Sequence, residues 1–345
     1  MLLTIIILVF SPLSHAFDWA LETDPQLPTG LHQTGIYNSD SGLSISKELY
    51  PFTPQYPLWT DGARKNRYAY VPSGKQIDSS NMDDWQFPHG TIFWKEFNFK
   101  NKKVETRVIA LTTKGWLYGS YQWNEQQTSA TLVQEAGAKN VAPIGFYKQG
   151  KELHHHIPSK LQCKACHNLG KSMILGFDSL QLSDDKDPNA VRWFPSSDQE
   201  LHFSISDLIQ NNLLTHPPKK PERINARSGM ERSALGYLHG NCGNCHRPTG
   251  AAQHTKLFFK HQMGNTLKTE PAIETSIHQK TFNYALPGLA KEETYRLVPG
   301  SPALSAVWFR LNSRNIKHQM PKIGSQVVDV QGSDLIFDWI LSLSY

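Results

Sequence analysis

Two short units, Cys163–His167 and Cys242–His246, contain every cysteine of this 345-residue chain. Both units have the pattern Cys-x-x-Cys-His. With four cysteines and fifteen histidines in the chain, about 0.002 copies of the pattern would arise by chance. Two disulfides, or one zinc ion held by four thiolates, would use the cysteines but would not explain the histidine after each pair. The pattern is instead typical of attachment sites for c-type haem.

The spacing gives each residue of the pattern a chemical role. Two intervening residues let both thiols reach the vinyl groups at one porphyrin edge, and the adjacent histidine can then bring its imidazole to the iron. We therefore predict two covalently bound haem c groups. The predicted thioether positions are Cys163, Cys166, Cys242 and Cys245, and the predicted proximal ligands are His167 and His246.

The sixth iron ligand distinguishes a closed haem from one that can bind a small molecule. For the second haem we predict Met320, which lies in a Met-Pro loop just before an expected C-terminal helix. Met263 lies in a polar stretch and is the weaker candidate.

The first haem has no comparable methionine, because Met173 follows His167 too closely to cross to the opposite face of the ring. We assign His156, from the triplet 154–156, as its working distal ligand. His202 and His216 are further candidates, and an open iron is the alternative.

Residues 17–150 have the pattern of β structure. In the segment 91–99, Phe93 and Phe97 share a face on which Lys95 is the exception. Val104, Thr106 and Val108 alternate at the strand period, and Gly and Pro separate such runs. This predicts an antiparallel sandwich or barrel-like domain.

The rest of the chain divides at a Pro-rich, basic stretch, Pro217–Pro221. Residues 151–225 are a loop-rich first haem segment with this linker and one short helix around 206–214. Residues 226–345 are expected to be helical, because Ser228 and Glu231 form a capping box before a helix that runs to Cys242. The apolar spacing over 335–343 predicts a terminal amphipathic helix. The fold class predicted is α+β with several domains, the last of them cytochrome c-like.

Residues 1–16 have the pattern of a secretory signal peptide. An apolar run of about nine residues is too short to span a ~30 Å hydrocarbon core. We expect cleavage before Phe17, export to the periplasm, and no membrane span afterwards. The net charge of +5 would be largely offset by haem propionates. Because no basic stretch is interleaved with aromatic residues, we expect no nucleic-acid partner.

Several motifs together resemble a family of exported bacterial dihaem c-type cytochromes. They are the run 56–65 (YPLWTDGARK), the segments 87–91 and 104–107, the residues 237–241 before the second motif, and Met320-Pro321. The resemblance covers residues 30–345, and its C-terminal part is similar to class I cytochromes c. Members of the family occur with, or fused to, quinoprotein sugar-dehydrogenase-like modules. The resemblance therefore implies a Gram-negative periplasm and redox partner proteins, a quinoprotein dehydrogenase among them.

Three functions are compatible with these observations. The leading one is electron transfer in a respiratory or dehydrogenase-linked chain. The alternative is a haem enzyme of the peroxidase or oxygenase type, with an open first haem fed by the second. A third is a binding protein whose β domain recognises a partner or a carbohydrate. We also expect the β domain to pack over the first haem.

Overall fold

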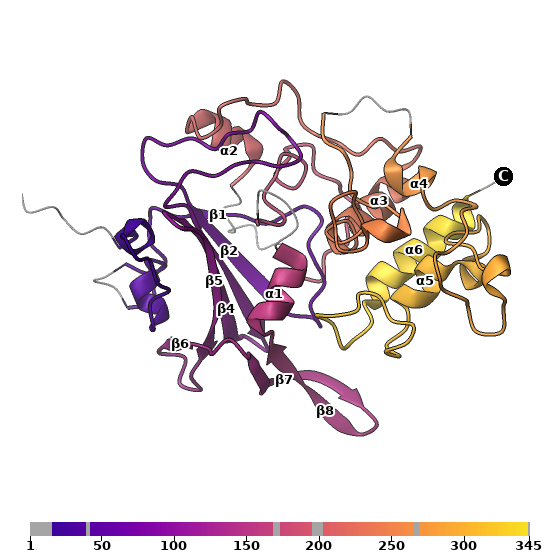
Figure 1. Ribbon diagram of the computed structural model, residues 1–345, viewed down its shortest axis with the longest axis horizontal. Helices are drawn as coiled ribbons and strands as arrows, with labels where there is room; N and C mark the ends of the chain where they lie inside the picture. The colour runs from indigo at the N-terminus through magenta and orange to yellow at the C-terminus, as the bar shows by residue number, and fades with distance from the viewer. Residues whose placement is uncertain (1–15, 39–41, 168–172, 195–202, 265–268, 344–345) are drawn as a thin grey trace, which may run out of the picture.

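A computed structural model describes residues 16–38, 42–167, 173–194, 203–264 and 269–343. The predicted signal peptide lies outside this part except for its last residue, and His202 also lies outside it. Figure 1 shows a β sheet at one side of the molecule and a group of helices at the other. Within the described residues, no helix is long and apolar enough to cross a membrane.

Six antiparallel strands form one sheet, and each strand pairs with its neighbour in the sequence. A separate two-stranded hairpin follows. The predicted mixed α and β content with an antiparallel sheet is therefore confirmed. The strands are β1 Tyr50–Pro51, β2 Arg64–Tyr70, β3 Ile92–Phe99, β4 Lys102–Thr112, β5 Gly115–Trp123 and β6 Ala130–Leu132, with β7 Ala138–Lys148 and β8 Lys151–Ile157 in the hairpin.

The two faces of the large sheet are covered by different parts of the chain. Trp94 and Val108 point to a core completed by the N-terminal segment, which carries the 3-10 helices η1 Asp18–Leu21 and η2 Leu31–Thr34. Phe93, one residue from Trp94, points the opposite way. It belongs to a core shared with the chain after the first motif, including Phe177. The chain after the first Cys-x-x-Cys-His motif therefore packs against the sheet.

The helices begin where local capping predicts. The Ser228 hydroxyl accepts a 3.1 Å hydrogen bond from the amide of Glu231, as the capping box requires. The terminal helix begins at Val330, ahead of the apolar spacing over 335–343 that predicts it, because the Asp329 carboxylate caps it through the amide of Gly332 at 3.1 Å. The helices are α1 Lys160–His167, α2 Ile205–Gln210, α3 Gly229–Asn241, α4 Pro271–Glu274, α5 Ala306–Leu311 and α6 Val330–Ser342, with η3 Gln253–Thr255, η4 Lys291–Glu293 and η5 Pro302–Leu304.

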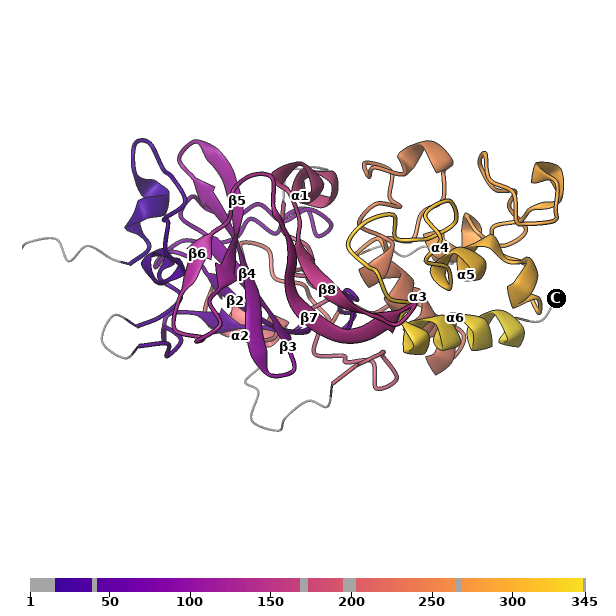
Figure 2. The same cartoon turned by 90° about the horizontal axis from the view of Figure 1, so that it is seen from below.

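The helices α3 and α6 pack on each other and on residues from much earlier in the chain. Their core includes Tyr56, Leu180 and Ile224. Helix α3 lies directly against Tyr56, because a Cβ at Gly236 would lie 2.0 Å from the tyrosine ring. Both views show α1 between the sheet and this group of helices (Figures 1 and 2).

Candidate functional site

The first Cys-x-x-Cys-His motif occupies helix α1. A reciprocal cap starts this helix: the Ser159 hydroxyl accepts from the amide of Gln162 at 3.3 Å, and the Gln162 side chain accepts from the amide of Ser159 at 3.0 Å. No side chain of α1 is buried, and Leu161 is 77% exposed. The helix is thus fixed by its cap and by its neighbours in the chain rather than by an apolar face of its own.

The second motif lies in a tight loop after α3. Two glycines make this loop possible, because a Cβ at Gly243 would lie 2.6 Å from the carbonyl oxygen of His239, and one at Gly250 would lie 2.1 Å from that of Cys245. The amide of Cys245 donates to the carbonyl of Cys242 at 3.1 Å. The loop therefore holds both cysteines of this motif in one turn.

The two motifs meet. All four cysteines are free thiols, and the thiols of Cys166 and Cys245 lie near enough for each to change the pKa of the other. This interaction lowers the pKa of Cys245 to about 7 and raises the pKa of Cys166. Burial raises the pKa of Cys242 to about 12. In the part of the chain that the structure describes, no three His, Cys, Asp or Glu side chains form a metal-binding group.

Both motif histidines are held in the same way. The Nδ1 atom of His167 lies 2.6 Å from the carbonyl oxygen of Met173, and that of His246 lies 3.1 Å from the carbonyl oxygen of Leu257. A ring that donates from Nδ1 to a carbonyl keeps the lone pair of Nε2 for a metal. This is the orientation that proximal ligands of iron require.

The electrostatics favour the neutral form of both rings. Burial lowers the pKa of His167 to about 4, and the positive charges of Lys95 and Arg107 act in the same direction. Burial also lowers the pKa of His246 to about 4, with a smaller contribution from Arg310. At neutral pH each imidazole is uncharged, and an uncharged imidazole is the form that binds iron.

Met320 lies in the neighbourhood of the second motif. Its amide donates to the carbonyl of Arg310 at 2.9 Å, and the charge of Arg310 acts on His246. The side chain of Met320 is half-buried. In contrast, the sulfur of Met263 accepts a 3.1 Å hydrogen bond from Ser179 within a buried core. Ligation by Met320 stays a prediction.

The histidine triplet lies on strand β8, and its members have different environments. His155 is buried, and its Nε2 lies 2.8 Å from the Glu105 carboxylate. The Nδ1 of His154 lies 3.2 Å from the carbonyl oxygen of Glu152. His156 is exposed, and its Nδ1 accepts from the amide of Asn140 at 3.0 Å. Of the three, His154 is held as His167 and His246 are, with Nδ1 beside a carbonyl oxygen. The Nδ1 of His156 accepts a hydrogen bond, which leaves the proton of this ring on Nε2. Ligation by His156 stays a prediction.

The other first-haem candidates are placed as follows. The Nδ1 of His216 lies 2.9 Å from the hydroxyl of Thr215, and its amide donates to Ser79 at 2.9 Å. The carbonyl oxygen of Met173 lies at Nδ1 of His167, away from the Nε2 atom that would bind iron. This agrees with the view that Met173 is badly placed to be a distal ligand.

Sequence reasoning missed one feature beside the first motif. Arg67, Lys95 and Arg107 lie directly opposite one another on strands β2, β3 and β4. The charge of Arg107 acts on Cys163 and that of Lys95 acts on His167. The exceptional position of Lys95 on an apolar face was the sequence signal for this row.

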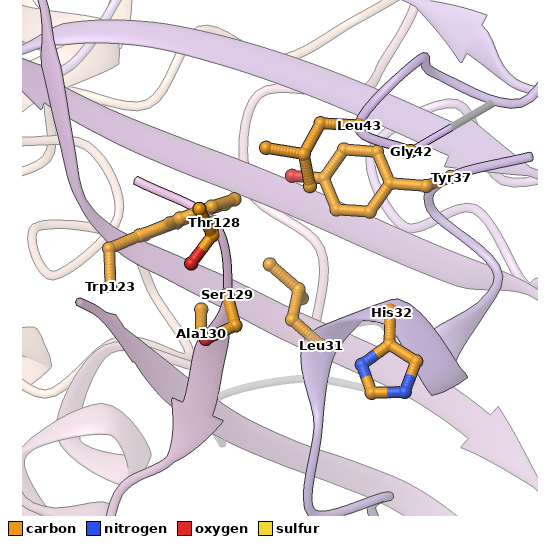
Figure 3. A pocket seen from close by; sticks show the side chains of 9 residues that line it. All are labelled: Leu31, His32, Tyr37, Gly42, Leu43, Trp123, Thr128, Ser129 and Ala130. Atoms are coloured by element: carbon orange, nitrogen blue, oxygen red, sulfur yellow. The ribbon is translucent and has the colours of Figure 1, made fainter. Parts of the chain in front are cut away.

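A pocket of about 160 Å³ lies on the other face of the sheet (Figure 3). Leu31, Tyr37 and Trp123 line it, and all three belong to the core formed with the N-terminal segment. It contains no cysteine and no residue of either motif. The candidate site is therefore the region where the two motifs meet.

Comparisons with protein-family models, with curated proteins and with solved structures give no match for this chain. The assignment of a function rests on the site itself.

Proposed function

We propose that this chain is an exported dihaem c-type cytochrome that transfers electrons in a respiratory or dehydrogenase-linked chain. The observation that carries the proposal is the pair of Cys-x-x-Cys-His motifs, which contain every cysteine of the chain and bring Cys166 near Cys245. Their proximity supports a function in which an electron passes from one site to the other.

The residues present fit the cofactor that the motifs imply. Each motif offers two free thiols and one neutral imidazole with an available Nε2. Haem c supplies one-electron transfer at an iron whose potential depends on its axial ligands. The backbone carbonyls of Met173 and Leu257 fix the tautomers and the orientations of His167 and His246.

We propose further that residues 226–345 form a class I cytochrome c-like domain. The chain order supports this, because α3 leads into the second motif, and the Met320 loop precedes α6. The helices α3 and α6 approach closely, since a Cβ at Gly332 would lie 2.2 Å from the ring of Tyr237. The sandwich or barrel-like character of the N-terminal domain stays a prediction.

Location and partners follow from the leader and from the resemblance. We place the mature protein in the periplasm, starting at Phe17. Its partners are redox proteins, a quinoprotein dehydrogenase among them. These assignments also place it in the family of exported bacterial dihaem cytochromes.

The test is purification of the full chain from the periplasm of a host that matures c-type cytochromes. Intact mass is expected to give a chain starting at Phe17 with two haems that survive a denaturing gel. Electron paramagnetic resonance of the oxidised protein is expected to show interaction between two ferric ions. A Cys242→Ala/Cys245→Ala variant is expected to keep one haem and lose the interaction. A protein whose mass shows no attached haem would contradict the proposed function. Two attached haems without magnetic interaction would contradict electron transfer between the two motifs.

One observation favours the alternative of an enzyme with an open first haem. The Nε2 of His155 faces the buried Glu105 carboxylate. The Nδ1 of His156 accepts from the amide of Asn140, so the proton of this ring lies on Nε2, the nitrogen that an iron would need. Carbon monoxide added to the reduced protein separates the two functions. Binding at one haem, unchanged in His156→Ala, supports the enzyme. Binding only in the variant supports the closed carrier.

A further inference from the structure

The cations Arg67, Lys95 and Arg107 form a row on the sheet face beside α1, and the neighbouring side chains do not neutralise all of their positive charge. Arg67 pairs with Lys95 and Lys95 with Arg107 in the strand register, so three cations stand side by side on neighbouring strands. Like charges directly opposite each other in a sheet are destabilising. Lys65 adds a fourth cation on the same face, two residues before Arg67.

Two of these cations have partners. Arg107 donates twice to the Glu105 carboxylate, at 2.7 and 3.0 Å. Lys65 donates to the carbonyl of Leu58 at 2.6 Å and is attracted by Asp61 and Asp329. Their charges are balanced by groups of the chain.

The other two have no such balance. Arg67 is 7% exposed, and the one hydrogen bond of its guanidinium to the described residues is a 3.4 Å contact with the carbonyl of Lys65. The Lys95 ammonium makes no hydrogen bond or ion pair with the described residues, and it lies 5.1 Å from the centroid of the Phe97 ring. Burial lowers the pKa of Lys95 well below its usual range, and the charges of Arg67, Lys65 and Arg107 lower it further, while the charge of Glu105, which is already paired with Arg107, opposes them.

We propose that Arg67 and Lys95, flanked by Arg107, form a buried anion site beside the first Cys-x-x-Cys-His motif, and that its ligand is a carboxylate. A buried guanidinium without a carboxylate partner is rare, because desolvation of an unpaired charge costs several kcal/mol. Arg67 offers its planar set of donors, and Lys95 offers three more.

Two sources of the carboxylate are possible in chemical terms. One is a propionate of the haem bound at the first motif, a reading that rests on the proposed function. The other is a small carboxylate from solution that binds next to that haem. Both would supply the negative charge that the row lacks, and they differ in whether the site depends on added carboxylate.

The test uses the full chain with haem attached and the variant Lys95→Met. Lys102→Met, an exposed lysine on strand β4, is the matched control. If an anion occupies the row, Lys95→Met loses an attraction and its Tm falls by at least about 3 °C. If no anion is present, the substitution removes a repulsion and Tm rises. The control is expected to leave Tm unchanged.

Two further measurements identify the source. Sodium formate, added at constant ionic strength against chloride, raises the Tm of the wild-type protein only if the site takes a carboxylate from solution. The haem propionate bending mode in resonance Raman spectra shifts in Lys95→Met only if the site holds a propionate. Either result together with a lower Tm in Lys95→Met supports the proposal.

A higher or unchanged Tm in Lys95→Met overturns the proposal. So does a lower Tm that comes with neither formate dependence nor a Raman shift. Intact mass of the same samples keeps this failure separate from failure of the proposed function. If two haems are attached but the Tm, formate and Raman measurements fail, the anion site alone is contradicted. If no haem is attached, the cytochrome assignment itself is contradicted.

Discussion

The histidines of this chain differ in what holds their ring nitrogens, and this difference separates ligands from structural groups. His167 and His246 are held at Nδ1 by carbonyl oxygens, which leaves Nε2 for iron. His239 is buried with its Nδ1 accepting from the amide of His261 at 3.0 Å and its Nε2 3.3 Å from Lys260. A histidine with both nitrogens engaged cannot bind iron without rearrangement. The sequence singles out His167 and His246 as proposed ligands only because each follows a cysteine pair.

His261 is expected to make stability depend on pH. Burial alone would lower its pKa, but hydrogen bonds to the carboxylates of Glu222 and Glu270 raise it to about 9, from the ordinary 6.5. Because the folded-state pKa is the higher one, the stabilisation is fully present below pH 6.5 and is lost as pH rises to about 9. It amounts to at most about 3 kcal/mol.

The variant His261→Gln tests this in urea denaturation between pH 6 and 9.5. Its deficit relative to the wild-type protein should be largest at pH 6 and should shrink towards pH 9. His32→Gln, at an exposed position, controls for changes in net charge. A deficit that stays constant over the whole range would show that the carboxylates do not hold a charged His261.

Met320 and Met263 are expected to respond differently to the same substitution. Met320→Ala should lower the potential of the second haem and abolish the weak red absorption band of a methionine-ligated ferric haem. Met263→Ala should leave the spectrum unchanged but destabilise the fold by about 2–5 kcal/mol, because Met263 is 6% exposed within the helical core. Redox titration and denaturation measure both effects. A persistent band in Met320→Ala would assign the sixth ligand to another residue.

At the scale of elements, helix α3 depends on two glycines four residues apart. A Cβ at Gly236 would lie 2.0 Å from the ring of Tyr56, and one at Gly240 would lie 2.3 Å from the carbonyl oxygen of Tyr56. The first contact is with a side chain and the second with the backbone. Glycine lowers helix propensity, so its presence at both positions indicates that close approach is required.

A pair of alanine variants separates these two contacts. Gly240→Ala should lower the free energy of unfolding by several kcal/mol in both the wild-type and the Tyr56→Ala background, because it displaces backbone. Gly236→Ala should be destabilising alone but close to neutral in Tyr56→Ala, since removal of the ring makes room for the methyl group. Thermal denaturation of the six proteins, the two backgrounds with and without each glycine substitution, measures the coupling. Equal destabilisation by Gly236→Ala in both backgrounds would contradict the role of the ring.

The sequence predicts those elements whose cause is local. The Ser228 cap and the apolar spacing of 335–343 identify α3 and α6, and the alternation around Phe93 identifies β3. Helix α5 was not predicted, because its six residues carry no capping hydrogen bond from a side chain. The contact of Cys166 with Cys245 was not predicted either, since it depends on how distant segments fold together.

At the scale of the whole molecule, the segment 56–61 joins the sheet to the helices. The amide of Trp59 donates to the side chain of Asn241 at 2.7 Å, directly before the second motif. The indole of Trp59 donates to the carbonyl of Val327 at 3.0 Å. The Asp61 carboxylate accepts from the amides of Gln326 and Val327, both at 2.8 Å. The motif that suggested a family resemblance is thus a structural clamp between strand β2 and the loop before α6.

This clamp should open when Asp61 loses its acceptor. Asp61 is 5% exposed, so Asp61→Ala leaves two half-buried amides, those of Gln326 and Val327, without this partner. Each such group costs about 1–3 kcal/mol. Hydrogen exchange of these two amides should therefore be faster by at least about tenfold in Asp61→Ala, since 1.4 kcal/mol corresponds to a factor of ten. Asp61→Asn keeps one acceptor oxygen and should exchange nearly as slowly as the wild-type protein. Fast exchange in both variants would assign the effect to the charge of Asp61, and slow exchange in both would show that the loop before α6 is held by other contacts.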